Sequence, residues 1–139
     1  MMVEASEDLK SKYQKMPLDL YFDKKITVKE LDQSTVKAVW HRLSKQYNIE
    51  DRPSIEVLLC KSFRDYRKLL RKISIIANND KRNEYPAIKA KGLTIRYDDG
   101  SWEVLIIDDT MGPRNLYKEL LHIVEFYKGL PQGTLSNRY

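Results

Sequence analysis

A β-hairpin in the second half of the chain is the feature that most constrains the fold. Two runs rich in apolar and β-branched residues, Leu93 to Tyr97 and Trp102 to Asp108, are separated by Asp98-Asp99-Gly100-Ser101. An Asp-Gly pair suits the backbone of a tight hairpin turn, so the two runs are predicted to pair as antiparallel strands. A further short apolar run, Ser54 to Cys60, predicts another buried strand.

Helical patterns surround these strands in the sequence. A helix is predicted from Val28 to Tyr47, with Thr27 as its cap and Glu30 completing a capping box. A second helix is predicted from Ser62 to about Asn78, and a third from Pro113 to Lys128. These elements predict an α+β fold, in which a small antiparallel or mixed sheet with a hairpin packs against three to four helices.

The length of 139 residues is that of a single domain, 1–139. Residues 1–25 are predicted as a less certain N-terminal extension, and residues 132–139 as a loose C-terminal tail. The apolar runs are too short to cross a membrane, and the N-terminus lacks the pattern of a signal peptide. The single cysteine, Cys60, cannot form an internal disulfide. An intracellular, cytoplasmic protein is therefore expected.

The last predicted helix carries the segment Lys118-Glu119-Leu120-Leu121-His122. At about 100° per residue, Lys118, Glu119, His122 and Glu125 fall on the side opposite the apolar residues. This polar side is predicted either as the solvated face of an amphipathic helix or as the wall of a cleft.

The segment resembles the zinc motif His-Glu-x-x-His, with Lys118 in the place of the first histidine. It follows a strand and a hairpin, and a helix–strand pair lies upstream. In this order the chain resembles the zincin metalloproteases in their smallest single-domain forms. The motif-level resemblance covers Leu93 to Leu130, and the upstream match is one of element order alone. The resemblance implies that Glu119 corresponds to the general base and His122 to the second zinc ligand.

Two departures from the family pattern argue against zinc chemistry. Lys118 is positively charged, and after Glu125 the sequence has no His, Asp, Glu or Cys to act as the third ligand. No catalytic residue, metal ligand or cofactor is therefore expected. If the chain were active, Glu119 would be catalytic, and if zinc bound, His122 and Glu125 would be its ligands. The ammonium of Lys118 is expected to balance the charges of Glu119 and Glu125 instead. His41, the other histidine, is predicted as an ordinary helix residue.

Positive side chains gather on one side of the helix that begins at Ser62. The net charge of +5 allows an anionic partner without requiring one. Phe63 and Tyr66 are predicted on the apolar side, which argues against stacking on unpaired bases. The candidate nucleic-acid contacts are Lys61, Arg64, Arg67, Lys68, Arg71 and Lys72.

The sequence favours a non-catalytic, zincin-like intracellular domain that acts as a binding or structural protein. The alternative is a nucleic-acid-binding protein that uses the basic helix 61–72. A second alternative is a metal-dependent peptidase with an atypical ligand set. The expected partner is an unidentified protein or a nucleic acid, and no membrane is expected. Small basic chains with few motifs are common among viral and mobile-element proteins, an association that names no function.

Overall fold

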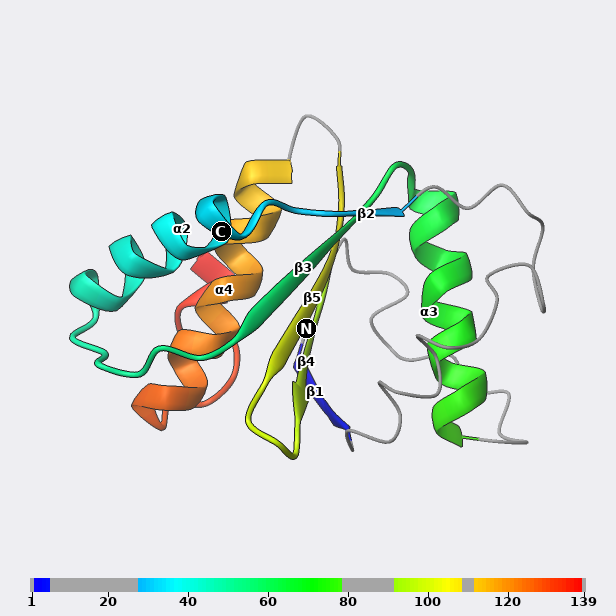
Figure 1. Ribbon diagram of the computed structural model, residues 1–139. Coiled ribbons are helices and arrows are strands. Elements are labelled where there is room, and N and C mark those ends of the chain that lie inside the picture. Colours follow the sequence, from blue (N-terminus) through cyan, green and yellow to red (C-terminus); the bar gives the residue numbers. More distant parts are fainter. Residues whose placement is uncertain (1, 6–27, 79–91, 109–111, 139) are drawn as a thin grey trace.

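The computed structural model describes residues 2–5, 28–78, 92–108 and 112–138, and places their side chains except those of residues 5, 72–78 and 112. A five-stranded mixed sheet lies between helices on both faces (Figure 1), which confirms the predicted α+β class. The elements in chain order are β1 (Met2–Ala5), β2 (Val28–Glu30), α2 (Gln33–Gln46), β3 (Ile55–Cys60), α3 (Phe63–Asn78), β4 (Gly92–Tyr97), β5 (Trp102–Ile107), α4 (Gly112–Lys128) and the 3-10 helix η2 (Ser136–Arg138).

The predicted hairpin is confirmed as the antiparallel pair β4 and β5, in which Thr94 faces Val104. At its turn, the Asp99 carboxylate accepts a hydrogen bond from the backbone N–H of Ser101 at 2.9 Å. Gly100 has a φ of +86°, a left-handed conformation that side chains disfavour. Local turn chemistry therefore accounts for this part of the sheet.

The strand order is β1-β4-β5-β3-β2. β3 runs parallel to β5, and β1 runs parallel to β4 at one edge of the sheet. β2 pairs antiparallel with β3 at the other edge. Residues 2–5 of the predicted N-terminal extension are thus an edge strand, whereas residues 6–27 lie outside the described part of the chain.

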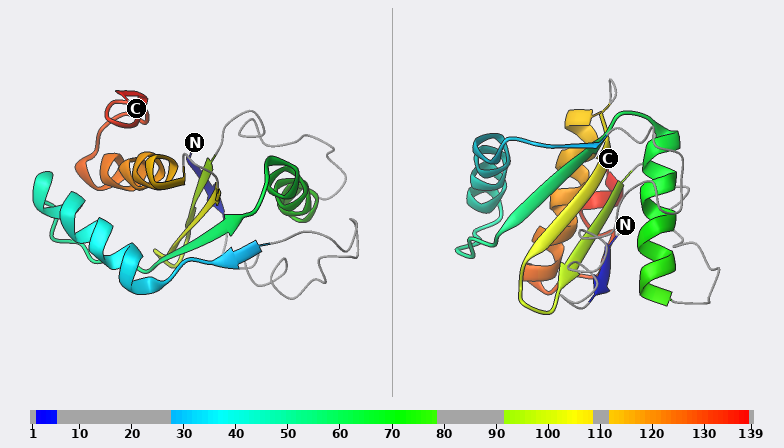
Figure 2. Two further views of the ribbon diagram at one scale, coloured as in Figure 1. Left: turned by 90° about the horizontal axis from the view of Figure 1, so that it is seen from above. Right: turned by 45° about the vertical axis from the view of Figure 1, so that its right-hand side comes forward.

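Side chains of β3 alternate between the two faces of the sheet. Ile55, Val57 and Leu59 pack on the face covered by α2 and α4, and Cys60 packs under α3. Figure 2 shows α2 and α4 together on one side of the sheet and α3 on the other. The central strands are therefore buried on both faces, which explains why they read as continuous apolar runs.

The layer formed by α2 and α4 is tied to the sheet by aromatic side chains. The indole N–H of Trp102 donates to the hydroxyl of Tyr127 at 3.1 Å. Tyr127 also packs edge-on against Trp40 of α2, with ring centroids 6.2 Å apart. One tyrosine therefore connects β5, α4 and α2. Among the described residues, no helix is long and apolar enough to span a membrane.

The predicted start of the first long helix is wrong. Residues 28–30 are the strand β2, and the helix begins at Gln33 with Asp32 as its N-cap. The Asp32 carboxylate accepts hydrogen bonds from the backbone N–H and the hydroxyl of Ser34. Pairing with β3 accounts for the difference, because Val28 and Glu30 bond to a strand about 30 residues away, which a local capping pattern does not reveal.

Candidate functional site

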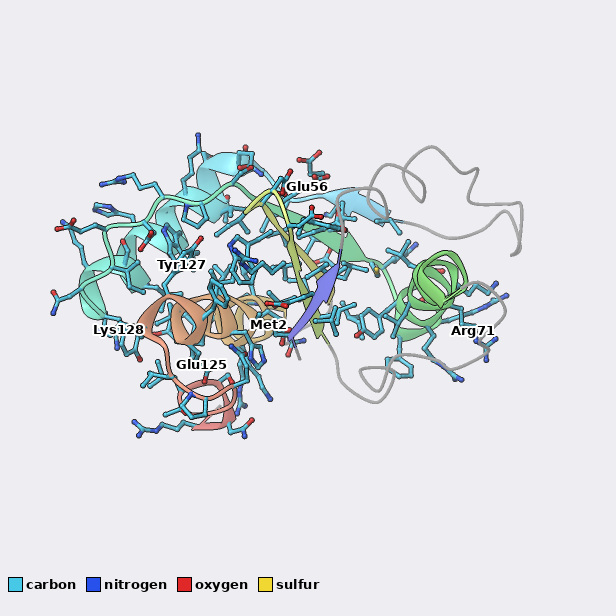
Figure 3. All side chains as sticks on the ribbon, turned by 90° about the horizontal axis from the view of Figure 1, so that it is seen from below. Met2, Glu56, Arg71, Glu125, Tyr127 and Lys128 are labelled. Atoms are coloured by element: carbon cyan, nitrogen blue, oxygen red, sulfur yellow. The ribbon has the colours of Figure 1, made fainter. Side chains whose placement is uncertain are left out.

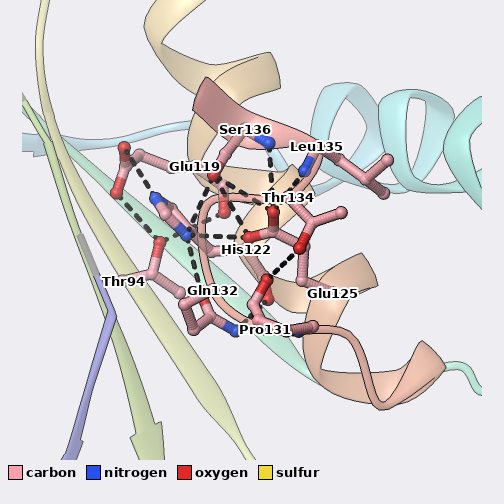
Figure 4. Close-up of polar contacts among 9 residues, drawn as sticks. All are labelled: Thr94, Glu119, His122, Glu125, Pro131, Gln132, Thr134, Leu135 and Ser136. Atoms are coloured by element: carbon pink, nitrogen blue, oxygen red, sulfur yellow. Dashed lines mark hydrogen bonds and ion pairs between the residues drawn. The ribbon is translucent and has the colours of Figure 1, made fainter. Parts of the chain in front are cut away.

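Three of the four residues on the polar side of α4 are buried under other parts of the chain, so this side is neither a solvated face nor the wall of a cleft. The exposed fractions are 3% for Glu119, 6% for His122 and 0% for Glu125. β4 covers Glu119, and residues 131–138, here called the C-terminal segment, cover His122 and Glu125 (Figure 4). These three residues form a polar cluster.

Glu119 lies directly on the backbone of β4. A Cβ at Gly92 would meet Cγ of Glu119 at 2.7 Å and Cδ at 2.8 Å, so a larger residue at this position would force the Glu119 side chain to shift. The hydroxyl of Thr94 lies 3.1 Å from Oε1 of Glu119 and 3.2 Å from its backbone carbonyl. β4 thus provides both the space and a hydrogen-bond donor for Glu119.

His122 lies between two carboxylates. Its Nδ1 is 3.1 Å from Oε1 of Glu125 and 2.7 Å from Oε1 of Gln132. Its Nε2 is 4.0 Å from Oε2 of Glu119. Because the oxygens nearest Nδ1 are acceptors, a proton on Nδ1 satisfies that side of the ring. The amide of Gln132 also donates to the backbone carbonyl of His122, at 3.2 Å.

Glu125 anchors the C-terminal segment to α4. Its Oε2 accepts hydrogen bonds from the backbone N–H groups of Leu135 at 2.6 Å and Ser136 at 3.1 Å. The Ser136 hydroxyl lies 3.2 Å from Oε1. Burial raises the pKa of Glu125, but backbone hydrogen bonds and the nearby His122 outweigh that effect, so its pKa is below its ordinary value.

The C-terminal segment is not the loose tail that the sequence predicts. Leu135 joins the apolar core shared by α2, α4 and the sheet, and Ser136 is fully buried. The Thr134 hydroxyl donates to the Pro131 carbonyl at 2.6 Å, and η2 closes the segment. Figure 3 shows Glu125 on the side of α4 that faces this segment. The C-terminal segment is held in place by a buried anion, Glu125, rather than by a long apolar stretch.

The polar cluster does not have the geometry of a zinc site. Among the described residues, no three His, Cys, Asp or Glu side chains could hold one metal ion. Glu125 approaches Nδ1 of His122, whereas Glu119 approaches Nε2. The two ring nitrogens point in different directions, so an ion on either one would meet only one carboxylate. A catalytic zinc site normally needs three protein ligands around one point.

Lys118 does not take the charge-balancing position that the sequence predicts. It is half-exposed, and no carboxylate in the described part of the chain lies within ion-pairing distance of it. His122 contacts both Glu119 and Glu125 instead. His41 is exposed on α2 and is not a partner of His122, whose contacts come from α4 and the C-terminal segment.

Ser136, His122 and Glu119 superficially resemble a nucleophilic triad, but their contacts argue against one. The Ser136 hydroxyl is 3.4 Å from Nδ1 of His122, farther than from either oxygen of Glu125. Ser136 has no exposed surface on which a substrate could bind. Its position fits a residue that holds the segment closed.

The α3 side of the sheet also buries titratable groups. Burial, and then the charge of Asp65, raises the pKa of the Cys60 thiol to about 12. Burial likewise raises the pKa of the Tyr66 hydroxyl, with a smaller contribution from the charge of Glu119. Both groups are therefore neutral at physiological pH, and neither is an activated nucleophile.

The basic side of α3 is largely exposed, but one aromatic residue is not where the sequence predicts it. Tyr66 is fully buried, whereas Phe63 is 41% exposed. The Arg67 guanidinium lies over the Phe63 ring at 5.8 Å from its centroid. The side chain of Lys72 lies outside the described part. Lys61, Arg64, Arg67 and Arg71 are exposed, and Lys68 is half-exposed.

Comparisons with protein-family models, with curated proteins and with solved structures gave no match.

Proposed function

We propose that the chain is a non-catalytic, zincin-like intracellular domain that acts as a binding or structural protein. The observation that supports this proposal is the use of Glu119 and His122 as internal contacts. The resemblance assigns these residues to the general base and the second zinc ligand. Here Glu119 contacts β4, and His122 contacts Glu125 and Gln132 of the C-terminal segment.

A general base must reach the proton that it removes, directly or through one water molecule. Glu119 is only 3% exposed, and its carboxylate lies against Gly92. A peptide would reach it only after the C-terminal segment or β4 had moved. The same contacts give each polar group a structural role, which favours a binding or structural function.

The test is metal analysis and peptidase assay of protein purified without added metal. The expected result is less than stoichiometric zinc and no cleavage of an unfolded protein substrate. Stoichiometric zinc together with cleavage that Glu119→Gln abolishes would overturn the proposal in favour of an atypical peptidase. Glu50→Gln, a change at an exposed glutamate outside the cluster, is the matched control.

A second candidate function is binding of single-stranded nucleic acid by α3. The exposed Phe63 ring supports it, because aromatic rings beside cations stack on unpaired bases. The hollow beside this ring has basic walls. It is lined by Phe63, Arg64, Arg67, Lys68 and Arg71.

Fluorescence anisotropy with a labelled oligothymidylate tests this candidate. Phe63→Ala should weaken binding by about 1–3 kcal/mol, the usual contribution of one stacked base. Affinity should also fall with salt, by about 0.7 log units per log unit of salt for each phosphate contacted. Lys128→Ala, at an exposed lysine on α4, is the control and should bind normally. Salt-independent binding, or full binding by Phe63→Ala, would exclude this mode.

A further inference from the structure

A groove on the opposite side of the molecule from α3 lies between α2 and the chain that leads into β3. Its volume is about 570 Å³, within the range of small-molecule sites. Figures 1 and 2 place α2 on the face of the sheet away from α3, so the groove is separate from the basic face of α3. The polar cluster of α4 does not line it. The lining residues are Gln33, Val36, Lys37, Trp40, His41, Arg52, Pro53, Ser54 and Ile55.

The floor of the groove is apolar and firmly held. Val36, Trp40 and Ile55 are buried core residues. The Gln33 amide donates to the Ile55 carbonyl at 2.9 Å, linking the start of α2 to the start of β3. The Trp40 indole N–H donates to the Asp51 carbonyl at 3.1 Å, which links α2 to the connection between α2 and β3. Both walls are thus joined by hydrogen bonds, so a ligand would meet a preformed surface.

The rim of the groove is basic. Lys37 and His41 project from α2, and Arg52 projects from the facing wall. All three are exposed, and none forms an ion pair or a side-chain hydrogen bond with a residue in the described ranges. Among the residues that the structure describes, no Asp or Glu lines the groove. The rim can therefore direct several donors towards one anion, and the Arg52 guanidinium can bind it in a bidentate manner.

We propose that this groove binds a small organic anion, in which a flat apolar ring lies on the floor and a phosphate or carboxylate group meets Lys37 and Arg52. The apolar floor favours a ring over a bare inorganic ion. The absence of carboxylates among the lining residues favours an anion over a neutral or cationic ligand. The Ser54 side chain, exposed on the same wall as Arg52, provides a further donor for the anionic group.

The proposal is tested by NMR titration of the full chain labelled with ¹⁵N. The probes are adenosine 5′-monophosphate, phenyl phosphate and indole-3-acetate. Their neutral parts are adenosine, phenol and indole, and the bare anions are inorganic phosphate and, for indole-3-acetate, acetate. At least one probe should cause saturable shifts at Lys37, His41 and Arg52, at concentrations up to about 10 mM. Its neutral part and its bare anion should each bind at least about tenfold more weakly.

Substitutions separate binding in the groove from general attraction to a basic surface. Arg52→Gln should weaken binding by about ten- to a hundredfold, as expected for loss of a hydrogen-bonded charge. Lys45→Gln is the control, because Lys45 is exposed on α2 but does not line this groove. Its affinity should be unchanged.

Three results would overturn the proposal. One is the absence of saturable shifts with all three probes. Another is an equal loss of affinity in Arg52→Gln and Lys45→Gln. The third is equal binding of inorganic phosphate and the aromatic anions, which would show attraction by charge alone. In the first case, a further titration with an acidic peptide that does cause saturable shifts would assign the groove to a protein partner.

Discussion

Glu125→Gln is the substitution that most directly tests the proposed anchor of the C-terminal segment. In the native protein, the Glu125 carboxylate faces the N–H groups of Leu135 and Ser136 and the hydroxyl of Ser136. A glutamine of nearly the same shape keeps one acceptor oxygen but places an NH₂ group against buried donors. The expected consequence is a less stable protein in which the segment is held more weakly.

The magnitude follows from the number and kind of bonds affected. Hydrogen bonds to a charged group contribute about 1.5–3 kcal/mol each, roughly twice the value for neutral pairs. The amide retains part of this interaction, so we expect Glu125→Gln to lower the free energy of unfolding by about 2–4 kcal/mol. This loss is a large part of the unfolding free energy of about 5–15 kcal/mol that is typical of a domain.

Urea unfolding followed by circular dichroism measures the effect, and a double-mutant cycle identifies its cause. The second change is a stop codon after Leu130, which removes the C-terminal segment. In that shortened chain Glu125 has lost its partners in the C-terminal segment and keeps only His122, in a pair that is then open to solvent. The glutamine substitution should therefore cost no more than about 1 kcal/mol. Glu50→Gln, at an exposed site, provides the matched control.

The same cycle has a defined pH dependence. Glu125 has a pKa below its ordinary value of 4.5, so its charged form is favoured in the folded state. Its contribution to stability is complete above that ordinary value and is lost as the pH falls through the lower folded-state pKa. The difference in unfolding free energy between the native protein and Glu125→Gln should therefore shrink below about pH 4.5. A difference independent of pH, or additive effects in the cycle, would refute the proposed anchor.

Three further predictions concern the sheet and the metal question. Gly92→Ala should lower the unfolding free energy by about 1–3 kcal/mol, because the new Cβ would overlap Glu119. Gly100→Ala places a Cβ that meets no atom within 4 Å, so it should lower the unfolding free energy by only about 1–2 kcal/mol, the cost of its positive φ. The Cys60 thiol should not react with an aromatic disulfide reagent at pH 8 in the folded protein, because burial raises its pKa to about 12. It should react fully in denaturant, and rapid labelling of the folded protein would contradict this prediction. Incubation with EDTA should leave the thermal unfolding midpoint unchanged, and a lower midpoint that added zinc restores would show that a metal stabilises the fold.

The elements that the sequence predicts correctly are those with local signals. The hairpin has an Asp-Gly turn, and α3 and α4 each have an apolar side with helical periodicity. β1 and β2 were missed because their evidence lies in distant partners. Met2 pairs with Thr94, and Val28 pairs with Cys60. A capping pattern around Glu30 could not compete with that pairing.

The polar cluster was predicted only in part for a similar reason. Helical periodicity places Glu119, His122 and Glu125 on one side of α4, and the structure does bring them together. Their burial depends on cover from β4 and the C-terminal segment, which periodicity within α4 cannot show. Leu135, the one aliphatic side chain among residues 132–139, is the signal that could have indicated this cover.

The attachment of the C-terminal segment also has a consequence for motion. Its contacts are concentrated on two polar residues of α4, Glu125 and His122, and on the apolar side chain of Leu135, while α4 is held by the sheet along its length. Such a segment can detach as a cooperative unit without unfolding the rest of the domain. Native-state hydrogen exchange should then show the amides of Leu135 and Ser136 opening together, at a lower free energy than those of β5. The polar side of α4 would meet solvent while the C-terminal segment is detached. The time for which it is exposed is therefore set by how long the segment stays detached.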